Sequence, residues 1–306
     1  MDARLTTTER PLHSDRRRQV ILVVLCLVAG IAPLAARWIP DEVTRISYGL
    51  VVTAVLLALT GLARREPQLR QYAGLTFAFF VLALVQVLNN AIPGYVGKNL
   101  LHDPPIVGNP LATTVAGTVV IQLLETAIAI VPIVLLTRLL GTGLGSIYAR
   151  VGKSGGWLTV ALIFFAVFYL FLATLPLRPD SPAHQLLPSS GAVTFARFLA
   201  LTPALLIVAI SNAFQEEFLF RGLFLQKYAA LFGIGTANVV QALVFAVAHV
   251  GITYTPTASL FIVAVVFPLG LVAGYLMRVT NGILTPAIFH AGLDLAIYLA
   301  FLSYAS

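Results

Sequence analysis

Long runs of apolar residues, separated by short polar segments, dominate the chain. A helix needs about 20 predominantly apolar residues to cross the hydrocarbon core of a bilayer. On that criterion we predict nine membrane-spanning helices, at residues 20–38, 46–63, 72–92, 111–140, 157–177, 192–228, 235–250, 258–277 and 282–302. The sixth run is too long for one straight span, so we expect Pro203 to bend it or its ends to lie in the interface. The pattern therefore predicts an all-α fold, a polytopic helical bundle of about eight or nine transmembrane helices.

The composition agrees with a membrane protein. Of the 306 residues, 59% are hydrophobic and 10% are charged, which is not the profile of a soluble domain. The net charge of +7 could suggest nucleic-acid binding, but the Lys and Arg residues are spread over short loops, so we expect no nucleic-acid partner. The single cysteine, Cys26, excludes an intramolecular disulfide and a cysteine-based metal site within this sequence.

The positions of the basic residues predict the orientation. With nine spans and a cytoplasmic N-terminus, 14 of the 19 Lys and Arg residues fall on the cytoplasmic side, as the positive-inside rule requires. Three consecutive arginines, Arg16 to Arg18, precede the first apolar run, which is long enough to be retained as a helix rather than cleaved as a signal peptide. We therefore expect an integral, multi-pass protein of the lipid bilayer, located in the plasma membrane if the source is bacterial.

The glycine-rich segment 141–156, "GTGLGSIYARVGKSGG", predicts a flexible linker between two parts of the chain. The first part, residues 1–156, would be a four-helix block with a cytoplasmic N-terminus, and its one intramembrane acid is Glu125. This acid could pair with another helix or line a cavity. The second part, residues 157–306, carries most of the polar residues found within apolar runs, between positions 216 and 294.

These polar residues follow helical spacing in three of the spans. Ionisable side chains in the bilayer cost about 3 kcal/mol each on insertion scales, so they face inward and find partners. Residues four apart share a helix face. In the sixth span this groups Asn212 with Glu216 and Glu217 with Arg221, and in the ninth it groups His290 with Asp294 and Tyr298. In the seventh span it groups Gln241, Phe245 and His249, and Asn238 lies near this row. We expect the three polar faces to meet in one cavity.

The depths of these residues do not coincide when they are counted from the cytoplasmic helix ends. At about 1.5 Å per residue, Glu216 would lie roughly 18 Å deep, His249 roughly 21 Å and His290 roughly 12 Å. Tilt, a kink or a shortened seventh span could bring the three side chains level.

A buried glutamate and two histidines in such a cavity indicate hydrolysis. The carboxylate can take a proton from water, one histidine can position that water, and a second histidine with a neutral carboxyl can donate hydrogen bonds to an oxyanion. The same residue types also suit a zinc site, in which Glu216, His249, His290 and Asp294 would be the ligands. No HExxH motif is present. The preferred interpretation needs no cofactor, and the sequence leaves Zn²⁺ open.

Three short motifs resemble those of a known family. "EEFLFR" fits EExxxR, "FAVAH" fits FxxxH, and "HAGLD" fits HxxxN/D, in this order and on separate apolar helices. This combination resembles the CPBP family of intramembrane proteases, which includes type II CAAX prenyl endopeptidases and bacterial proteins linked to bacteriocin processing or self-immunity. The resemblance covers roughly residues 192–302.

The resemblance implies a glutamate-dependent intramembrane endopeptidase, a hydrolase of a family often labelled metalloprotease. Its substrate would be a membrane-associated peptide or protein, of the prenylated or the bacteriocin type. In this sequence Glu216 would activate water together with His249, and His290 and Asp294 would stabilise the oxyanion. Glu217 and Arg221 would support Glu216 as a pair, and Phe245 would shape the site.

One position departs from the family pattern, since asparagine often occupies the place of Asp294. An ionised Asp294 would repel an oxyanion, so it must be protonated, orient His290 or bind a metal. Structural alternatives exist for the other residues as well. The Glu217–Arg221 pair could be purely structural, Phe245 could be ordinary packing, and Asn212, Asn238 and Gln241 fit hydrogen bonds between helices.

The main functional alternative is a proton- or ion-coupled transporter that uses the same ionisable residues as a relay. A transporter would need a polar path to the outer face. The outer halves of the last two spans, "VAVVFPLGLV" and "AIYLAFL", are apolar, which argues against such a path.

Overall fold

The computed structural model describes residues 16–103, 112–153, 155–174, 193–250 and 258–305, and within these ranges it contains helices and no strand. In the first half the helices are α1 (Arg16–Leu34), η1 (Ala35–Trp38), α2 (Glu42–Arg65), η2 (Arg70–Tyr72), α3 (Ala73–Asn99), α4 (Val115–Leu139) and η3 (Leu144–Ile147). In the second half they are α5 (Gly155–Thr174), α7 (Phe195–Glu216), η4 (Glu217–Gly222), α8 (Leu223–Phe232), α9 (Ile234–Ala248), α10 (Ala258–Phe261), η5 (Ile262–Val266), α11 (Phe267–Thr280) and α12 (Leu284–Tyr304). Both η4 and η5 are π-helical turns.

Eight of the described helical runs are long and apolar enough to cross a membrane. The all-α, polytopic prediction is therefore confirmed, with eight candidate spans instead of nine. The difference is the predicted span 235–250, which becomes α9, a helix of only 15 residues. At 1.5 Å per residue, α9 is about 22 Å long, which is shorter than a hydrocarbon core of about 30 Å.

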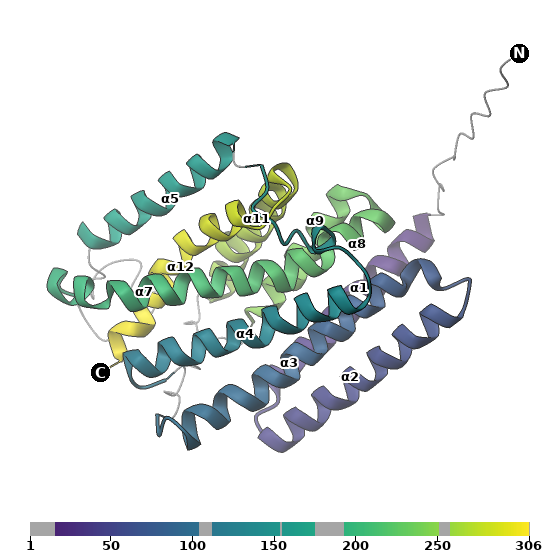
Figure 1. The fold of residues 1–306 in the computed structure, drawn as a ribbon, viewed down its shortest axis with the longest axis horizontal. Coiled ribbons are helices and arrows are strands. Elements are labelled where there is room, and N and C mark those ends of the chain that lie inside the picture. Colours follow the sequence, from purple (N-terminus) through teal and green to yellow (C-terminus); the bar gives the residue numbers. More distant parts are fainter. Residues whose placement is uncertain (1–15, 104–111, 154, 175–192, 251–257, 306) are drawn as a thin grey trace, which may run out of the picture.

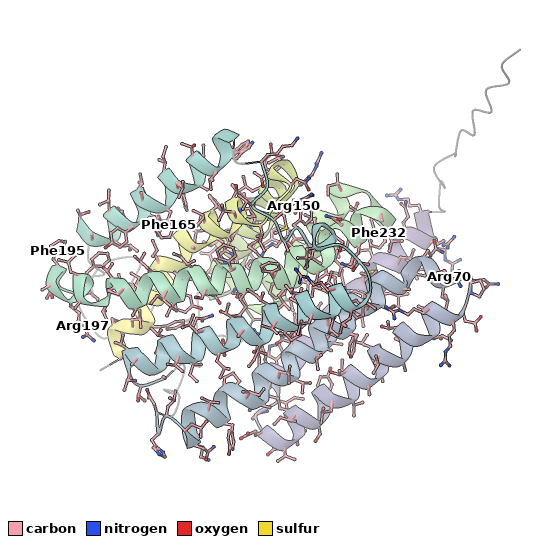
Figure 2. The ribbon with its side chains drawn as sticks, viewed as in Figure 1. Arg70, Arg150, Phe165, Phe195, Arg197 and Phe232 are labelled. Carbon is pink, nitrogen blue, oxygen red and sulfur yellow. The ribbon has the colours of Figure 1, made fainter. Side chains whose placement is uncertain are left out.

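The sixth predicted span is one continuous helical run from Phe195 to Phe232, 38 residues long. Figure 2 labels its two ends, Phe195 on α7 and Phe232 on α8, on opposite sides of the molecule. Pro203 lies inside α7 without ending it. The interruption comes later, where the π-helical turn η4 replaces regular α-helix at Glu217–Gly222.

Helices of the first half pack directly on helices of the second half. In Figure 1, α4 runs beside α7 through the middle of the bundle, and α5 lies at its edge. Phe79 of α3 contacts Phe224 of α8 with ring centroids 5.1 Å apart. Gly30 lets α1 approach α9, because a Cβ at this position would lie 3.1 Å from the side chain of Val244. The proposed boundary between blocks 1–156 and 157–306 stays a prediction, but the two parts share a continuous core.

The flexible linker expected at 141–156 was wrong for residues 144–153, which are held against the core. The backbone N–H of Lys153 donates to the Thr280 carbonyl at 2.6 Å, and that of Ile283 donates to the Arg150 carbonyl at 3.0 Å. Gly152 adopts a φ of +83° and touches Gly282 backbone to backbone. Glycine is used here because the left-handed conformation and the close approach leave no room for a Cβ. The segment packs against the turn between α11 and α12.

Candidate active site

The carboxylate of Glu216, the last residue of α7, lies between two imidazole rings. Its Oε2 is 3.8 Å from Nε2 of His249 at the end of α9 and 3.5 Å from Nε2 of His290 on α12. This oxygen is buried and accepts no hydrogen bond from the described residues. The structure thus brings together an acid and two histidines from three separate helices.

The depth mismatch expected from the sequence disappears for physical reasons. Helices α8 and α9 form a hairpin through the single residue Gly233, whose φ is +76°. Glu216 lies 16 residues before Phe232 and His249 lies 15 residues after Ile234, so the two side chains rise to similar heights above this turn. His290 is only 6 residues from the start of α12 at Leu284, so α12 must begin about 15 Å above the turn. The packed segment 144–153 contacts the start of α12 at this level.

The neighbouring acid, Glu217, serves a different partner. Its Oε1 lies 3.1 Å from Nη1 of Arg221 and accepts a hydrogen bond from Nδ1 of His290 at 2.9 Å. The side chains of Glu217 and Arg221 are fully buried, and 2% of the His290 side chain is exposed. The expected Glu217–Arg221 pair is present, and Glu217 also binds His290. Support of Glu216 by this pair, which the resemblance implied, stays a prediction.

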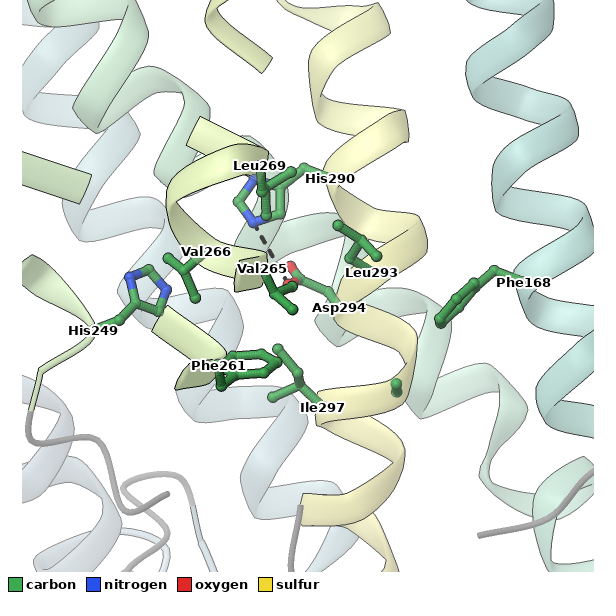
Figure 3. Close-up of a pocket in the computed structure, with 11 residues that line it drawn as sticks. Phe168, His249, Phe261, Val265, Val266, Leu269, His290, Leu293, Asp294 and Ile297 are labelled. Atoms are coloured by element: carbon green, nitrogen blue, oxygen red, sulfur yellow. Dashed lines mark ion pairs between the residues drawn. The ribbon is translucent and has the colours of Figure 1, made fainter. Parts of the chain in front are cut away.

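Asp294 lies beside His290 on α12. Its Oδ1 is 3.6 Å from Nε2 of His290, the contact marked by the dashed line in Figure 3. Its Oδ2 accepts a hydrogen bond from Nδ2 of Asn212 on α7 at 3.0 Å. The hydrogen bond between helices that was expected for Asn212 is confirmed, and it also holds Asp294 in place. The orienting carboxylate on Nδ1 of His290 comes from Glu217, which leaves Asp294 directed at the pocket.

Phe245 of α9 contacts three of the polar side chains of the site. Its ring is fully buried and stands edge-to-face with His249 at 4.6 Å and with His290 at 5.7 Å between centroids. The Arg221 guanidinium lies over the same ring at 4.0 Å, a cation–π contact. The Phe245 carbonyl also accepts a hydrogen bond from Nδ1 of His249 at 2.8 Å. Phe245 thus shapes the site through both its ring and its backbone.

A cavity of about 200 Å³ opens beside these residues. His249, His290 and Asp294 supply its polar wall, as Figure 3 shows. The other walls are apolar, with Phe168 from α5 and Ile297 from α12 among them. A wall with a few polar groups beside an apolar chamber suits a ligand that is itself mostly apolar.

Other residues of the predicted polar faces turn away from the site. Gln241 and Asn238 donate to the carbonyls of Gly270 and Leu271 at 2.8 and 2.9 Å, which confirms the expected hydrogen bonds between helices, here α9 and α11. The Tyr298 hydroxyl donates to Oε1 of Gln122 on α4 at 3.0 Å. Gln241 and Tyr298 share the helical spacing of the site residues on their helices. Spacing alone does not show which residues of a helix face reach the site and which contact a neighbouring helix.

Glu125 of α4 lies at the margin of the site, where it interacts electrostatically with Arg37 and with Glu216. The sequence marked Glu125 as the one acid within the first-half spans. In the sequence, Arg37 counted only as one of the five basic residues outside the cytoplasmic set. No pattern in the sequence pointed to its proximity to the site.

The zinc alternative requires ligands that converge on one point. Among the residues that the structure describes, no group of three or more His, Cys, Asp or Glu side chains is arranged to hold a metal ion. The reaction proposed below therefore contains no step through a metal.

Comparison with protein families bears on the same segment. Residues 198–296 match the family model of the Rce1-like type II CAAX prenyl endopeptidases. The matched segment contains Glu216, Glu217, Arg221, Phe245, His249, His290 and Asp294, and it ends two residues after Asp294. No curated protein and no solved structure matches the chain.

The match confirms the resemblance to the CPBP proteases and implies protease activity, hence a hydrolase. Together with the eight candidate spans, it fits an integral, multi-pass membrane protein that acts on a membrane-associated substrate. The helices before residue 198, including α1 to α4, lie outside the match.

Proposed function

We propose that this chain is a glutamate-dependent intramembrane endopeptidase, in which Glu216 and His249 activate a water molecule and His290 and Asp294 stabilise the oxyanion. The observation that carries the proposal is the pairing of Glu216 Oε2 with His249 Nε2 across 3.8 Å. The match to a protease family over residues 198–296 supports the same activity.

The two facing atoms are both hydrogen-bond acceptors. The Phe245 carbonyl can only accept, so Nδ1 of His249 carries the proton of the neutral ring and Nε2 presents a lone pair. The carboxylate of Glu216 is likewise an acceptor. A water molecule between them can donate one O–H to each, which a separation above 3.5 Å suits. Its own lone pair would then be free to attack.

The reaction follows from this geometry. The water oxygen attacks the carbonyl carbon of the scissile peptide bond, and Glu216 takes one proton from the water. The carbonyl oxygen becomes an oxyanion, which hydrogen bonds from Nε2–H of His290 and from a protonated Asp294 would stabilise. When the C–N bond breaks, the proton passes from Glu216 to the leaving nitrogen. The products are a carboxylic acid and an amine.

The substrate class follows from the surroundings of the site. The chamber next to His290 and Asp294 is largely apolar, and helices that could span a membrane surround it. A peptide held at the membrane by a hydrophobic segment or a lipid group could place an apolar side chain there. A prenylated C-terminal segment and a bacteriocin-type precursor both meet this description.

Peptide cleavage by the purified full-length protein in detergent tests the proposal. The probes are quenched-fluorescent peptides, one set with a farnesylated cysteine near the C-terminus and one set with an unmodified hydrophobic segment. We expect Glu216→Gln and His249→Ala to lower kcat by about 100-fold or more, because the first removes the base that takes the proton from water and the second removes a hydrogen-bond acceptor for that water. The exposed residue Glu66 supplies the matched control, and Glu66→Gln should cleave like the wild type.

A zinc chelator should leave the rate unchanged in the same assay, since no water-activating metal takes part in the proposed reaction. A chelator-sensitive zinc protease assayed in the same detergent shows that the reagent works. Loss of activity with chelator and its return with zinc would overturn the metal-free mechanism. Failure of the wild type to cleave any peptide of either set would overturn the endopeptidase assignment. The transport alternative gains no support from the family match.

A further inference from the structure

His249 lies at the C-terminal end of α9, where the backbone hydrogen bonds of the helix run out. α9 ends at Ala248, and His249 is its C-terminal cap. The last carbonyls of a helix have no partner within the helix, so they need donors from elsewhere. The hydrogen bond from His249 Nδ1 to the Phe245 carbonyl fixes the ring relative to α9. It does not fix the end of α9 relative to Glu216.

Two side chains from the first half of the chain supply donors at this point. Nη1 of Arg37 donates to the Ala248 carbonyl at 3.0 Å, and Nε1 of Trp38 donates to the Val250 carbonyl at 2.9 Å. Both donors belong to η1, and their acceptors are the residues on either side of His249. A cation at a helix C-terminus also interacts favourably with the helix dipole. Arg37 and Trp38 are called the η1 clamp below.

The clamp is itself held in place. α1 packs along α9 through Gly30 and Val244, and Leu34 and Ala36 next to the clamp are almost fully buried. The Tyr48 hydroxyl of α2 donates to the Ala32 carbonyl at 3.0 Å, which ties the end of α1 to α2. The clamp therefore transmits the position of the first-half helices to the end of α9.

The charge of Arg37 bears on the site as well. Arg37 interacts electrostatically with His249 and with Glu125, and Glu125 interacts with Glu216. A neutral residue at position 37 would remove a hydrogen bond at Ala248 and leave Glu125 without its neighbouring cation. The first effect acts on His249 and the second on Glu216, the two groups that would hold the attacking water.

We propose that Arg37 and Trp38 are positioning residues that hold His249 opposite Glu216, which makes the first-half helices a working part of the active site. This inference rests on the proposed function for its kinetic consequence. Its structural consequence, a tethered end of α9, does not depend on activity. An error of about 1 Å in the placement of a catalytic group can cost about 100-fold in rate.

Hydrogen–deuterium exchange of the full-length protein in nanodiscs tests the tether directly. The amides of His249 and Val250 are bonded to the carbonyls of Ala246 and Val247 at 3.1 and 3.0 Å, so their exchange reports the end of α9. Arg37→Gln and Trp38→Phe should each raise exchange in residues 246–250 by about tenfold and leave α7 unchanged. Arg65→Gln, which removes an exposed arginine at the end of α2, should change neither segment. Unchanged exchange at 246–250 in both clamp variants would overturn the inference.

Kinetics with the farnesylated or hydrophobic peptide that the wild type cleaves supply the second readout. Arg37→Gln should lower kcat by about 10-fold to 100-fold with KM changed by less than about twofold. Arg37→Lys, which keeps a charge and a donor, should recover part of the loss. A rise in KM alone, or no recovery with lysine, would show that Arg37 does not position His249.

The two proposals fail separately in these experiments. If the wild type cleaves and Glu216→Gln does not, while Arg37→Gln matches the wild type in both rate and exchange, the clamp is refuted and the protease assignment stands. If no peptide is cleaved, the protease assignment fails, and the exchange experiment alone decides whether the clamp exists.

Discussion

Glu216 and Glu217 are adjacent and chemically identical, yet they have different partners. Successive residues on a helix point about 100° apart, so Glu216 can face His249 while Glu217 faces Arg221 and His290. Glu216 Oε2 has no hydrogen-bond partner among the described residues, whereas Glu217 bridges Arg221 and His290. The i, i+4 pairing of Glu217 with Arg221 could be predicted from spacing. The bond to His290 could not, because contacts between distant helices are not encoded in local spacing.

Asp294 provides the first prediction at this scale. Asn212 already donates to Oδ2 of Asp294. The other oxygen, Oδ1, would therefore carry the proton of the acid and donate it in a hydrogen bond to the oxyanion. Asp294→Asn keeps the acceptor for Asn212 and supplies an N–H donor in place of the acid. We expect Asp294→Asn to retain activity within about tenfold of the wild type and Asp294→Ala to lose about 100-fold or more. The measurement is kcat in the peptide assay, and equal losses in the two variants would contradict the hydrogen-bonding role.

The buried Glu217–Arg221 pair provides the second prediction at the scale of residues. Both side chains are fully buried, so removing one charge leaves the other uncompensated. Glu217→Gln should therefore destabilise the fold by about 3 to 5 kcal/mol, visible as a lower thermal unfolding midpoint in detergent.

The double variant Glu217→Gln with Arg221→Met is the matched control, because it removes both charges from the same place. We expect it to recover most of the lost stability, since a well-packed apolar replacement of a buried pair is often neutral. Its activity should stay below that of the wild type, because a neutral amide holds His290 less firmly than a carboxylate does. A double variant no more stable than Glu217→Gln would show that the pair contributes through packing.

At the scale of elements, the segment 144–153 and the helix α9 depart most from expectation. A run rich in glycine was read as flexible, but Gly152 is where the chain touches Gly282 and takes a positive φ. Glycines used for close approach and glycines used for flexibility look the same in a single sequence. The short α9 was counted among the spans although its predicted run, 235–250, has only 16 residues, against 15 in the helix.

Gly152→Ala tests whether this segment is packed. A Cβ at position 152 would lie 2.6 Å from the Thr280 carbonyl oxygen and 2.8 Å from the Gly282 Cα, in addition to the strain of a φ of +83°. We expect a loss of about 1 to 3 kcal/mol, measured as a lower thermal midpoint. Gly143→Ala is the control from the same glycine-rich segment, because its Cβ would meet nothing within 4 Å and its φ is −67°. Equal midpoints for the two variants would mean that residues 144–153 are not held as described.

At the scale of the whole molecule, the sequence was sufficient for the architecture and for the meeting of the site helices. Apolar runs gave the helices, and polar residues at helical spacing gave the faces that meet at Glu216, His249 and His290. The relative heights of the helices could not be predicted, because a 38-residue helical run and a 15-residue helix meet in one bundle. For the same reason the proximity of η1 to the end of α9 could not be predicted.

Orientation in the bilayer remains a prediction from the charge distribution, and it can be measured. Pro40 and Gln68 lie in exposed turns at opposite ends of α2, and the one native cysteine, Cys26, is buried. Pro40→Cys should react with a membrane-impermeant maleimide in right-side-out vesicles, and Gln68→Cys should react in inside-out vesicles. The wild type measures the background from Cys26. The reverse pattern would place the N-terminus outside and contradict the predicted topology.

The π-helical turn at Glu217–Gly222 has a consequence for how this sequence can diverge. Its hydrogen bonds reach one residue further than those of an α-helix, so the turn holds an additional residue in the middle of a long run. Losing or gaining one residue there would rotate the helix on one side by about 100° relative to the other. Each acid would then point about 100° away from the partner that it now faces. Substitutions between Glu217 and Gly222 can be tolerated as long as they fit their neighbours, whereas a change in the number of residues cannot. We therefore expect a relative with a gap at this place to lack the peptidase activity proposed here.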